Sequence, residues 1–340
     1  MINDIQATIT DFEQRDKRTD FYRLEIADLE GSDCVLAGSV LDGVGLAELG
    51  QALQARFPSI TFDLERVTVL SQTVPRMAIV SVNTTAVLSN PSWASETMSE
   101  VLNGWSVEIL MERERWAFTR QDDGYLGWIY RPYLMETAVS PPTHMIYEPI
   151  SLLHAQPDAD AELVGRVFSG TAVFVTKQTA QWLHIELAGG LSGWILQTHA
   201  RRLAELPTDT SARRETITTN AHKLMGVPYL WGGGTANGLD CSGFSQMLYR
   251  LAGVTIPRDA DMQFDAGMPV EPSFEPGDLL YFGGSKDGHR AISHVGISLG
   301  GWQMIHASRG RNGVYIDDVQ ATPWLMDMYL GARTFLAGGE

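Results

Sequence analysis

The sequence predicts a multi-domain chain of four segments: a small α+β unit, two small β-barrels and a C-terminal α+β domain. Three observations support this prediction. Residues 1–72 combine a helical stripe with strand-like runs, residues 75–205 contain an internal repeat, and residues 212–338 begin with helices and continue with strands. Helices followed by an antiparallel sheet are typical of α+β domains.

The first segment, residues 1–72, has strand-like runs at 21–26 and 34–40. A helical stripe follows, and alternation from Ile60 onward then indicates a half-buried strand. The stripe consists of Leu46, Leu49, Leu53 and Phe57. The predicted order is therefore β-β-α-β. Cys34 falls in the second strand, where a core thiol is the expected role. No motif assigns a function to this unit.

The second and third segments are related by an offset of 66 residues. Matching glycines mark equivalent turns, and matching tryptophans mark equivalent core positions. Each repeat is a series of short strands broken by Gly, Pro, Asn and Asp, which favours a small β-barrel. The spacing resembles bacterial SH3-like domains, here at 75–138 and 142–205. The matches are Pro91 with Pro157, Gly104 with Gly170, Trp116 with Trp182, and Gly127-Trp128-Ile129 with Gly193-Trp194-Ile195.

The composition is that of a globular protein, with 44% hydrophobic and 19% charged residues. The formal net charge is -16, of which -12 lies before Pro207 and -4 from there onward. Such a chain repels polyanions, so we expect no nucleic acid partner and no anionic membrane surface. No apolar run approaches the roughly 18 residues that cross a bilayer, so no integral membrane segment is expected. The oligomeric state is left open.

The N-terminal stretch lacks the basic start and apolar run of a signal peptide. We therefore expect a cytoplasmic protein, or an exported one whose signal peptide has been removed. The chain has two cysteines, Cys34 and Cys241, and no CxxC pair. This excludes a disulfide framework and gives no indication of a cysteine metal site.

Cys241 is predicted to begin a helix. Asp240 is a good N-cap, an apolar stripe follows at helical spacing, and Gly253 ends the helix. The helix dipole and free N–H groups of a first turn favour a thiolate and can receive an oxyanion. The glycines at 232–234 allow close approach of a substrate to the backbone.

Other roles for these residues are less favoured. A buried structural cysteine is the usual alternative, but the helix-start position and the adjoining glycines favour a nucleophile. A phosphate-binding loop is excluded, because no Lys-Ser or Lys-Thr follows the glycines.

His294 begins one strand-like run, and His306 lies near the end of the next one. A thiol nucleophile needs an imidazole base whose tautomer is fixed by a third group. Both rings share a face if the connection is the odd-length loop 299–301, which would pair His294 directly with His306. Zinc binding by His289, His294 and His306 is the alternative, but the spacing fits no familiar site. We expect no metal and no cofactor.

The last segment resembles the NlpC family of bacterial cell-wall cysteine peptidases, which have a papain-like fold. The matching blocks are Pro228-Tyr-Leu-Trp-Gly-Gly, Asp240-Cys-Ser-Gly-Phe, Ile256-Pro-Arg with Gln263, Pro276-Gly-Asp-Leu, His294-Val-Gly-Ile and Ile305-His-Ala-Ser. The resemblance implies Cys241 as nucleophile, His294 as base and His306 as the group that orients it. It also implies that Tyr229, Asp240 and Ser242 line the pocket.

The implied substrate is a peptidoglycan-derived peptide, cut between D-glutamate and a diamino acid. In relatives of this family with N-terminal SH3-like domains, the first such domain contributes a tyrosine to the catalytic cleft. Tyr125 is the candidate for that tyrosine here, because it has no aromatic counterpart in the second repeat. This implies a closed end for a free N-terminal L-alanine, with Asp240 opposite its ammonium. The alternatives are a hydrolase of intact wall anchored by the SH3-like domains and a silent wall-peptide binding protein. Ala260 stands where the family often has a hydroxyl residue, and the preferred diamino acid is left open.

Overall fold

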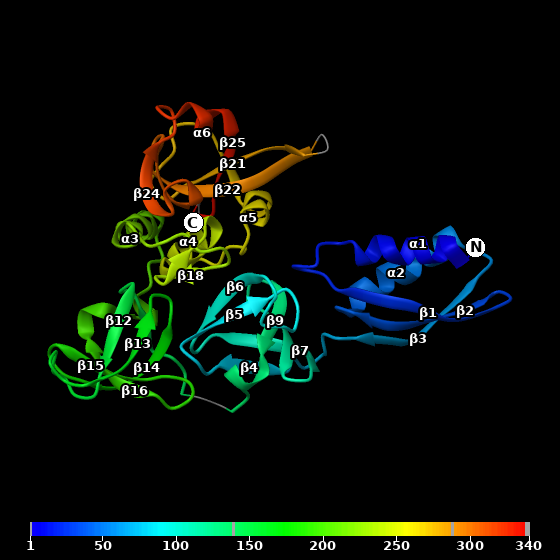
Figure 1. Ribbon diagram of the computed structural model, residues 1–340, viewed down its shortest axis with the longest axis horizontal. Coiled ribbons are helices and arrows are strands. Elements are labelled where there is room, and N and C mark those ends of the chain that lie inside the picture. Colours follow the sequence, from blue (N-terminus) through cyan, green and yellow to red (C-terminus); the bar gives the residue numbers. More distant parts are fainter. Residues whose placement is uncertain (1, 138–139, 287–288, 337–340) are drawn as a thin grey trace. The chain divides into compact units, whose positions relative to one another are not determined.

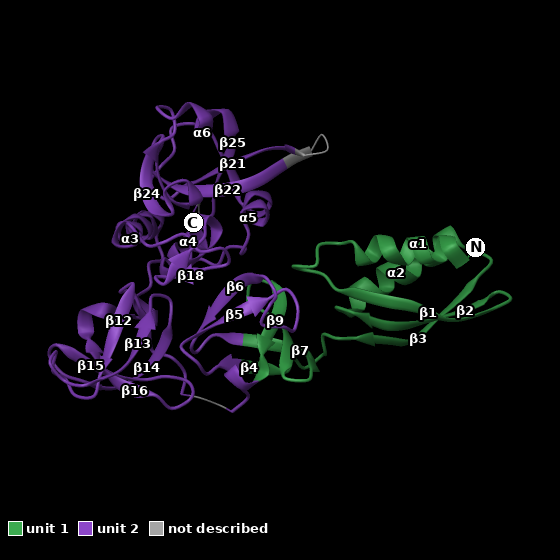
Figure 2. Cartoon of the chain, in the orientation of Figure 1, with its two compact units in different colours: residues 1–78, 107–131 green, residues 79–106, 132–340 purple. Residues whose placement is uncertain are grey.

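The computed structural model describes residues 2–137, 140–286 and 289–336. Contacts within the chain divide it into two compact units (Figure 2). The first comprises residues 1–78 and 107–131, and the second comprises residues 79–106 and 132–340. The first repeat is thus shared between the units, and the predicted domain limits stay predictions. None of the helices in the described part of the chain is long and apolar enough to span a membrane.

The N-terminal segment is a three-stranded sheet of order β1-β2-β3 with two helices. β1 and β2 are antiparallel, whereas β2 and β3 are parallel, because α2 connects them as a crossover. The elements are α1 (Ile2–Glu13), β1 (Tyr22–Glu30), β2 (Asp33–Val40), α2 (Gly43–Arg56) and β3 (Thr61–Val69).

Helix α1 was absent from the predicted β-β-α-β order. Its buried residues Ile5, Ile9 and Phe12 recur at helical spacing and share a core with Leu49 of α2. Both helices cover the same face of the sheet (Figure 1). Cys34 is fully buried in this core, which confirms the prediction of a core thiol.

The 66-residue repeat is confirmed strand by strand. Five strands, β5 to β9, each begin 66 residues before their counterparts, β12 to β16. The second repeat forms a seven-stranded sheet of order β13-β12-β16-β15-β14-β11-β17. Trp182 is buried in it as predicted, and Trp194 is half-buried with its ring against His184.

The elements of the first repeat are β4 (Met77–Val80), β5 (Thr84–Leu88), β6 (Thr97–Leu102), β7 (Ser106–Arg113), β8 (Trp116–Arg120), β9 (Leu126–Tyr130), η1 (Arg131–Tyr133) and β10 (Leu134–Met135). Those of the second are β11 (His144–Ile146), β12 (Ile150–His154), β13 (Leu163–Phe168), β14 (Ala172–Gln178), β15 (Trp182–Glu186), β16 (Ser192–Leu196), η2 (Gln197–His199), β17 (Ala200–Arg202) and η3 (Leu203–Glu205).

The C-terminal segment has helices first and then a six-stranded sheet of order β20-β25-β21-β22-β23-β24, as an α+β domain should. β20, β25, α5 and α6 were not predicted. The elements are α3 (Thr210–Lys223), β18 (Gly234–Thr235), β19 (Gly238–Leu239), α4 (Cys241–Leu251), α5 (Ala260–Ala266), β20 (Met268–Val270), β21 (Leu279–Lys286), β22 (His289–Gly300), β23 (Gln303–Ser308), η4 (Arg309–Arg311), β24 (Gly313–Asp318), α6 (Pro323–Met328) and β25 (Tyr329–Thr334).

The core of this domain continues into the second barrel. Phe244 of α4 and Val295 of β22 belong to one buried cluster with Met145 and Tyr147 of the second repeat. The Tyr147 hydroxyl donates to the carbonyl of Leu251, at the end of α4. The second barrel therefore supports the helix that begins at Cys241.

The equivalent glycines of the two repeats make a paired stability test. Both have a left-handed backbone, with φ of 79° at Gly104 and 86° at Gly170. A Cβ at Gly104 would lie 2.7 Å from the carbonyl oxygen of Ala172, whereas one at Gly170 would lie 3.3 Å from a methyl of Leu102. Both alanine variants lose about 1 kcal/mol or more through φ alone. We expect Gly104→Ala to lower the free energy of unfolding by at least ~1 kcal/mol more than Gly170→Ala. The reason is that the backbone oxygen of Ala172 can move away from a new Cβ less easily than the side-chain methyl of Leu102 can. Urea denaturation measures both, and equal losses would contradict this packing argument.

Candidate active site

Cys241 is the first residue of α4, as the sequence predicted. Asp240 is the N-cap, and its carboxylate accepts from the Gly243 N–H at 2.6 Å. The apolar stripe of the helix is buried, and Gly253 follows its end with φ of 73°. The thiol is only 7% exposed. The cap therefore fixes the helix start, and the buried stripe fixes the direction in which Cys241 points.

The glycine loop before Cys241 is packed by its own chain. A Cβ at Gly232 would lie 2.4 Å from the Thr97 carbonyl oxygen of β6, and one at Gly233 would lie 2.3 Å from the Gly238 carbonyl oxygen. These glycines are thus required by backbone neighbours. This is a different reason from the substrate approach that the sequence suggested.

Burial raises the pKa of the Cys241 thiol to about 12, and the carboxylate of Asp240 adds to this increase. The backbone N–H groups of Val295 and Ser242 oppose it. The predicted preference of the helix start for a thiolate is therefore wrong in its net direction, because desolvation outweighs the N–H groups. Cys241 therefore rests as a thiol, and the nucleophilic role predicted for it requires a base.

The two predicted histidines lie together. Nε2 of His294 is 2.7 Å from Nδ1 of His306. Burial lowers the pKa of His294 to about 3, with His306 adding to the effect, and lowers that of His306 to about 4, with Arg311 adding. Both rings are therefore neutral at neutral pH, and Nδ1 of His294 is left as the atom that can take a proton.

The route to this pairing differs from the one predicted. β22 and β23 pair Ile297 with Ile305, and the connection is a two-residue turn rather than an odd-length loop. An irregularity between Ser298 and Gly300 shifts the register by one residue. This shift brings the side chains of His294 and His306 back to the same face of the sheet. A Cβ on Gly296 would lie 3.0 Å from the Cβ of His306, so Gly296 lies beside His306 in the position predicted for His294. Because Gly296 has no side chain, the ring of His306 is free to meet that of His294, its diagonal neighbour across the two strands.

Asp317 of β24 is a neighbour of His306 that sequence reasoning missed. Its Oδ2 lies 3.3 Å from Nε2 of His306, and its Oδ1 is held by Arg311 at 2.8 Å. Burial raises the pKa of Asp317, whereas Arg311 opposes that rise. Within the described ranges, Nε2 of His306 makes no hydrogen bond, so Asp317 acts on it only through its charge at 3.3 Å. That charge favours one tautomer chain, in which Nε2 of His306 and Nε2 of His294 carry the hydrogens and the latter is directed at Nδ1 of His306. Nδ1 of His294 is then an acceptor.

Asp240 and Ser242 are tied to a buried arginine. Arg258 is 1% exposed, and its Nη2 lies 2.7 Å from Oδ2 of Asp240. Its Nη1 donates to Oδ1 of Asp240 at 3.1 Å and to the Ser242 hydroxyl at 2.9 Å. Asp240 also accepts from the Gly232 N–H. Both predicted pocket residues are thus engaged by the protein, and their contact with substrate stays a prediction.

Tyr229 and Glu100 complete the surroundings of the nucleophile. Burial raises the pKa of Tyr229 to about 12, and the neighbouring Cys241 and Asp240 add to it. Glu100 of β6 accepts from the Gly234 N–H at 2.9 Å, and burial raises its pKa, with Asp240 adding to the increase. Sequence reasoning missed Glu100. The sequence contains a signal for it: Glu100 corresponds to Arg166 in the second repeat, so the charge is reversed between two equivalent strand positions.

Tyr125 is 2% exposed within the first compact unit, where its backbone N–H bonds the carboxylate of Asp123. It is not an exposed turn tip, and its predicted substrate contact stays a prediction. Among the residues described, none gather as three or more possible metal ligands of the His, Cys, Asp or Glu type. The side chain of His289, which belonged to the zinc alternative, lies outside the described residues.

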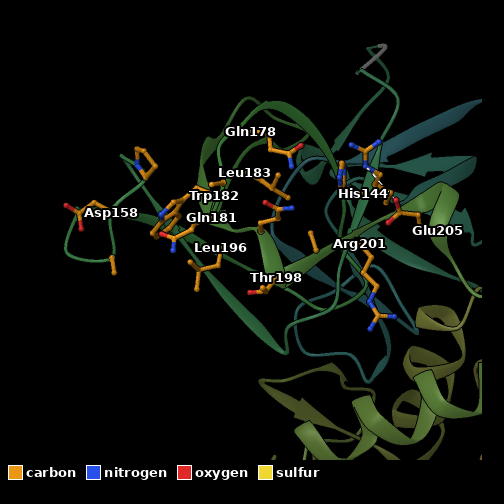
Figure 3. Close-up of a pocket in the computed structure, with 16 residues that line it drawn as sticks. His144, Asp158, Gln178, Gln181, Trp182, Leu183, Leu196, Thr198, Arg201 and Glu205 are labelled. Carbon is orange, nitrogen blue, oxygen red and sulfur yellow. Dashed lines mark ion pairs between the residues drawn. The ribbon is translucent and has the colours of Figure 1, made fainter. Parts of the chain in front are cut away.

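A surface hollow of about 920 Å³ lies in the second barrel, with Trp182, Gln181 and Leu196 along it (Figure 3). Every residue that lines it falls between His144 and Glu205, and none of these is a predicted catalytic residue. The chemistry of Cys241 is therefore separate from this hollow.

A profile of the NlpC/P60 family matches residues 226–333. The chain contains an NlpC/P60 domain. A bacterial SH3 domain profile matches residues 152–200, which belong to the second repeat. The blocks that carried the resemblance all lie in or beside the matched NlpC/P60 range.

Two relatives extend the likeness beyond the NlpC/P60 domain. A gamma-D-glutamyl-L-lysine dipeptidyl-peptidase of Bacillus cereus is 26% identical, over 72% of this chain and 76% of its own length. Dipeptidyl-peptidase 6 of Lysinibacillus sphaericus is 28% identical, over 71% of this chain and 91% of its own. A crystal structure of an NlpC/P60 family protein from Bacillus cereus matches with a TM-score of 0.67 at 21% identity, over 77% of this chain and 100% of that one. The fold of barrels followed by a papain-like domain is thus shared.

Cys241→Ala should lower turnover by roughly a thousandfold or more, because the nucleophile is removed. Its thermal stability should fall by about as much as that of Cys34→Ala, since both thiols are buried and each variant loses the packing of one sulfur atom. Cys34→Ala is the matched control: it should lose stability through its buried position yet keep its specific activity. Steady-state rates and thermal melts of both proteins test this, and full activity in Cys241→Ala would contradict the assignment.

The pH at which kcat/KM falls on the acid side should be lower than the ordinary pKa of a histidine. The pKa of His294 is lowered from 6.5 to about 3, so its neutral, proton-accepting form persists as the pH falls and is lost only near that lower pKa. We expect kcat/KM to hold its value down to about pH 6 and to decline only below it. A half-maximal point near 6.5 would mean that His294 is solvated during catalysis.

Proposed function

We propose that the chain is a cysteine peptidase that cleaves the bond between D-glutamate and a diamino acid in peptidoglycan-derived peptides. The observation that carries this proposal is that Cys241, at a helix start, meets the backbone N–H of Val295, the residue after His294, whose ring contacts that of His306. The names of the two relatives support the same bond, since both are dipeptidyl-peptidases and one is specified as gamma-D-glutamyl-L-lysine.

The proposed reaction uses the tautomer chain described above. The Cys241 sulfur attacks the γ-carbonyl carbon of D-glutamate while Nδ1 of His294 takes the thiol proton. Backbone N–H groups at the start of α4 stabilise the oxyanion. The C–N bond then breaks, the amine of the diamino acid leaves with the proton from His294, and a thioester remains. Water, deprotonated by His294, hydrolyses the thioester and restores the thiol.

The acidic groups beside Cys241 support recognition of a free N-terminal amine. Asp240 and Glu100 lie within electrostatic reach of each other, and Arg258 is the buried cation that compensates them. Asp240 already accepts from Arg258, Ser242 and two backbone N–H groups. Glu100 has fewer donors, so we propose Glu100 as the main partner of the L-alanine ammonium. An unpaired ammonium in such a site would be costly, whereas a paired one is favoured.

The free amine should therefore determine the rate. Acetylating the alanine of L-Ala-γ-D-Glu-diamino acid should lower kcat/KM by about 100-fold, because Glu100 and Asp240 lose their cation. Glu100→Gln should lower kcat/KM for the free peptide by at least tenfold and change the residual rate on the acetylated peptide much less. Peptide cleavage followed by chromatography measures all four rates. Equal cleavage of free and blocked peptides would instead favour the hydrolase of intact wall.

A further inference from the structure

An exposed tryptophan near the nucleophile holds a cation on one side and an anion on another. Trp231 is 52% exposed and lies two residues after Tyr229, whose hydroxyl is electrostatically coupled to Cys241. Its indole N–H donates to Oε1 of Glu96 at 2.7 Å. The guanidinium carbon of Arg309 lies 5.2 Å from the centre of the Trp231 ring and 5.4 Å from that of Tyr229. We call Trp231, Arg309 and Glu96 the rim cluster.

The protein neutralises neither charge of the rim cluster. In the part of the chain that the structure describes, Arg309 and Glu96 take part in no ion pair, whereas nearby Arg258 and Arg311 are each paired with a carboxylate. Both side chains are exposed. In a protein of net charge -16, an arginine that has no carboxylate partner in the described part of the chain and lies over Tyr229, a neighbour of Cys241, is available for an anion from a ligand.

The two charges are held by one indole ring, so they are separated by no more than the indole and two contact distances. A ligand that satisfies both must carry an ammonium and a carboxylate close together, next to an apolar stretch that can pack on the ring. This is the chemistry of an amino acid zwitterion at the end of a methylene chain.

The diamino acid that leaves in the proposed reaction can be L-lysine or 2,6-diaminopimelate, and only one of them has such a side chain. That of L-lysine ends in an ammonium alone, whereas that of 2,6-diaminopimelate ends in a carbon that carries both an ammonium and a carboxylate. We propose that the rim cluster binds the diaminopimelate end and selects it over L-lysine. Arg309 receives the carboxylate, Glu96 the ammonium, and Trp231 the methylenes. This inference rests on the proposed function and adds the choice of diamino acid.

The carboxylate distinguishes Arg309 from Glu96 in the test. Both diamino acids have the distal ammonium, so Glu96 acts on both, whereas only diaminopimelate has the distal carboxylate. The other carboxylates of the substrate, on D-glutamate and on the α-carbon of the diamino acid, are present in both peptides. An arginine that bound one of those would affect the two peptides alike.

The experiment compares L-Ala-γ-D-Glu-L-Lys with L-Ala-γ-D-Glu-meso-diaminopimelate on the full-length protein. The wild type should have the larger kcat/KM for the diaminopimelate peptide. Arg309→Gln should reduce the ratio of the two values by about 10- to 100-fold, the usual effect of losing a charge-assisted hydrogen bond. Arg309→Lys should retain part of the ratio. Glu96→Gln should lower both values by about tenfold and leave the ratio nearly unchanged.

Arg201→Gln is the matched control, because Arg201 is also an exposed arginine stacked on a tyrosine, 4.5 Å from the centre of Tyr147, away from Cys241. It should change neither value. If Arg309→Gln lowers both peptides equally, or the wild type prefers the lysine peptide, the inference is wrong while the proposed function stands. If the wild type cleaves neither peptide although iodoacetamide alkylates Cys241, the proposed function fails as well.

Discussion

The ion pair between Arg258 and Asp240 is the interaction on which the site depends. Both side chains are buried, so neither charge could remain there without the other. Through Asp240 the pair fixes the start of α4 and the Gly232 backbone, and through Nε of Arg258 it reaches the hydroxyl of Ser99 in β6. One guanidinium therefore joins the nucleophile helix, the glycine loop and a strand of the first repeat. The Ile-Pro-Arg block at 256–258 therefore has a structural role, because its arginine makes these contacts.

The second constraint is the exclusion of water around the reacting groups. Burial opposes charge on both the thiol and the imidazoles, so the resting site holds neutral partners connected by directed contacts. Asp317 and Arg311 lie at the far end of this chain, where a carboxylate can fix the tautomer of His306 without placing a charge beside the sulfur. In the proposed reaction, a neutral thiol passes one proton to a neutral imidazole, so no preformed thiolate is needed.

The sequence was sufficient wherever local pattern determines local structure. The N-cap and apolar stripe located Cys241, the 66-residue repeat located the equivalent glycines and tryptophans of the two barrels, and the strand-like runs that contain His294 and His306 located β22 and β23. It was insufficient where contacts join distant segments. Asp317 meets His306 because β24 pairs with β23, and Glu100 meets Gly234 across more than a hundred residues. The two-residue turn with its irregularity was also missed, because a single displaced residue such as Leu299 leaves no periodic signal. Helix α1 was missed although Ile5, Ile9 and Phe12 carry its period.

The two repeats differ in how they contact the C-terminal domain. The strands that correspond by position have kept their glycines and tryptophans, which the barrel needs, and have diverged where β6 meets the C-terminal domain. Ser99 and Glu100 of the first repeat correspond to Gly165 and Arg166 of the second. Only the first repeat therefore has a hydroxyl that accepts from Arg258 and a carboxylate that accepts from the glycine loop. The second repeat instead contributes Met145 and Tyr147 to the core beneath α4. The first repeat thus contacts the groups at the start of α4, and the second supports the opposite end of the helix. Both barrels therefore have a role in positioning Cys241 that does not require either to hold the cell wall.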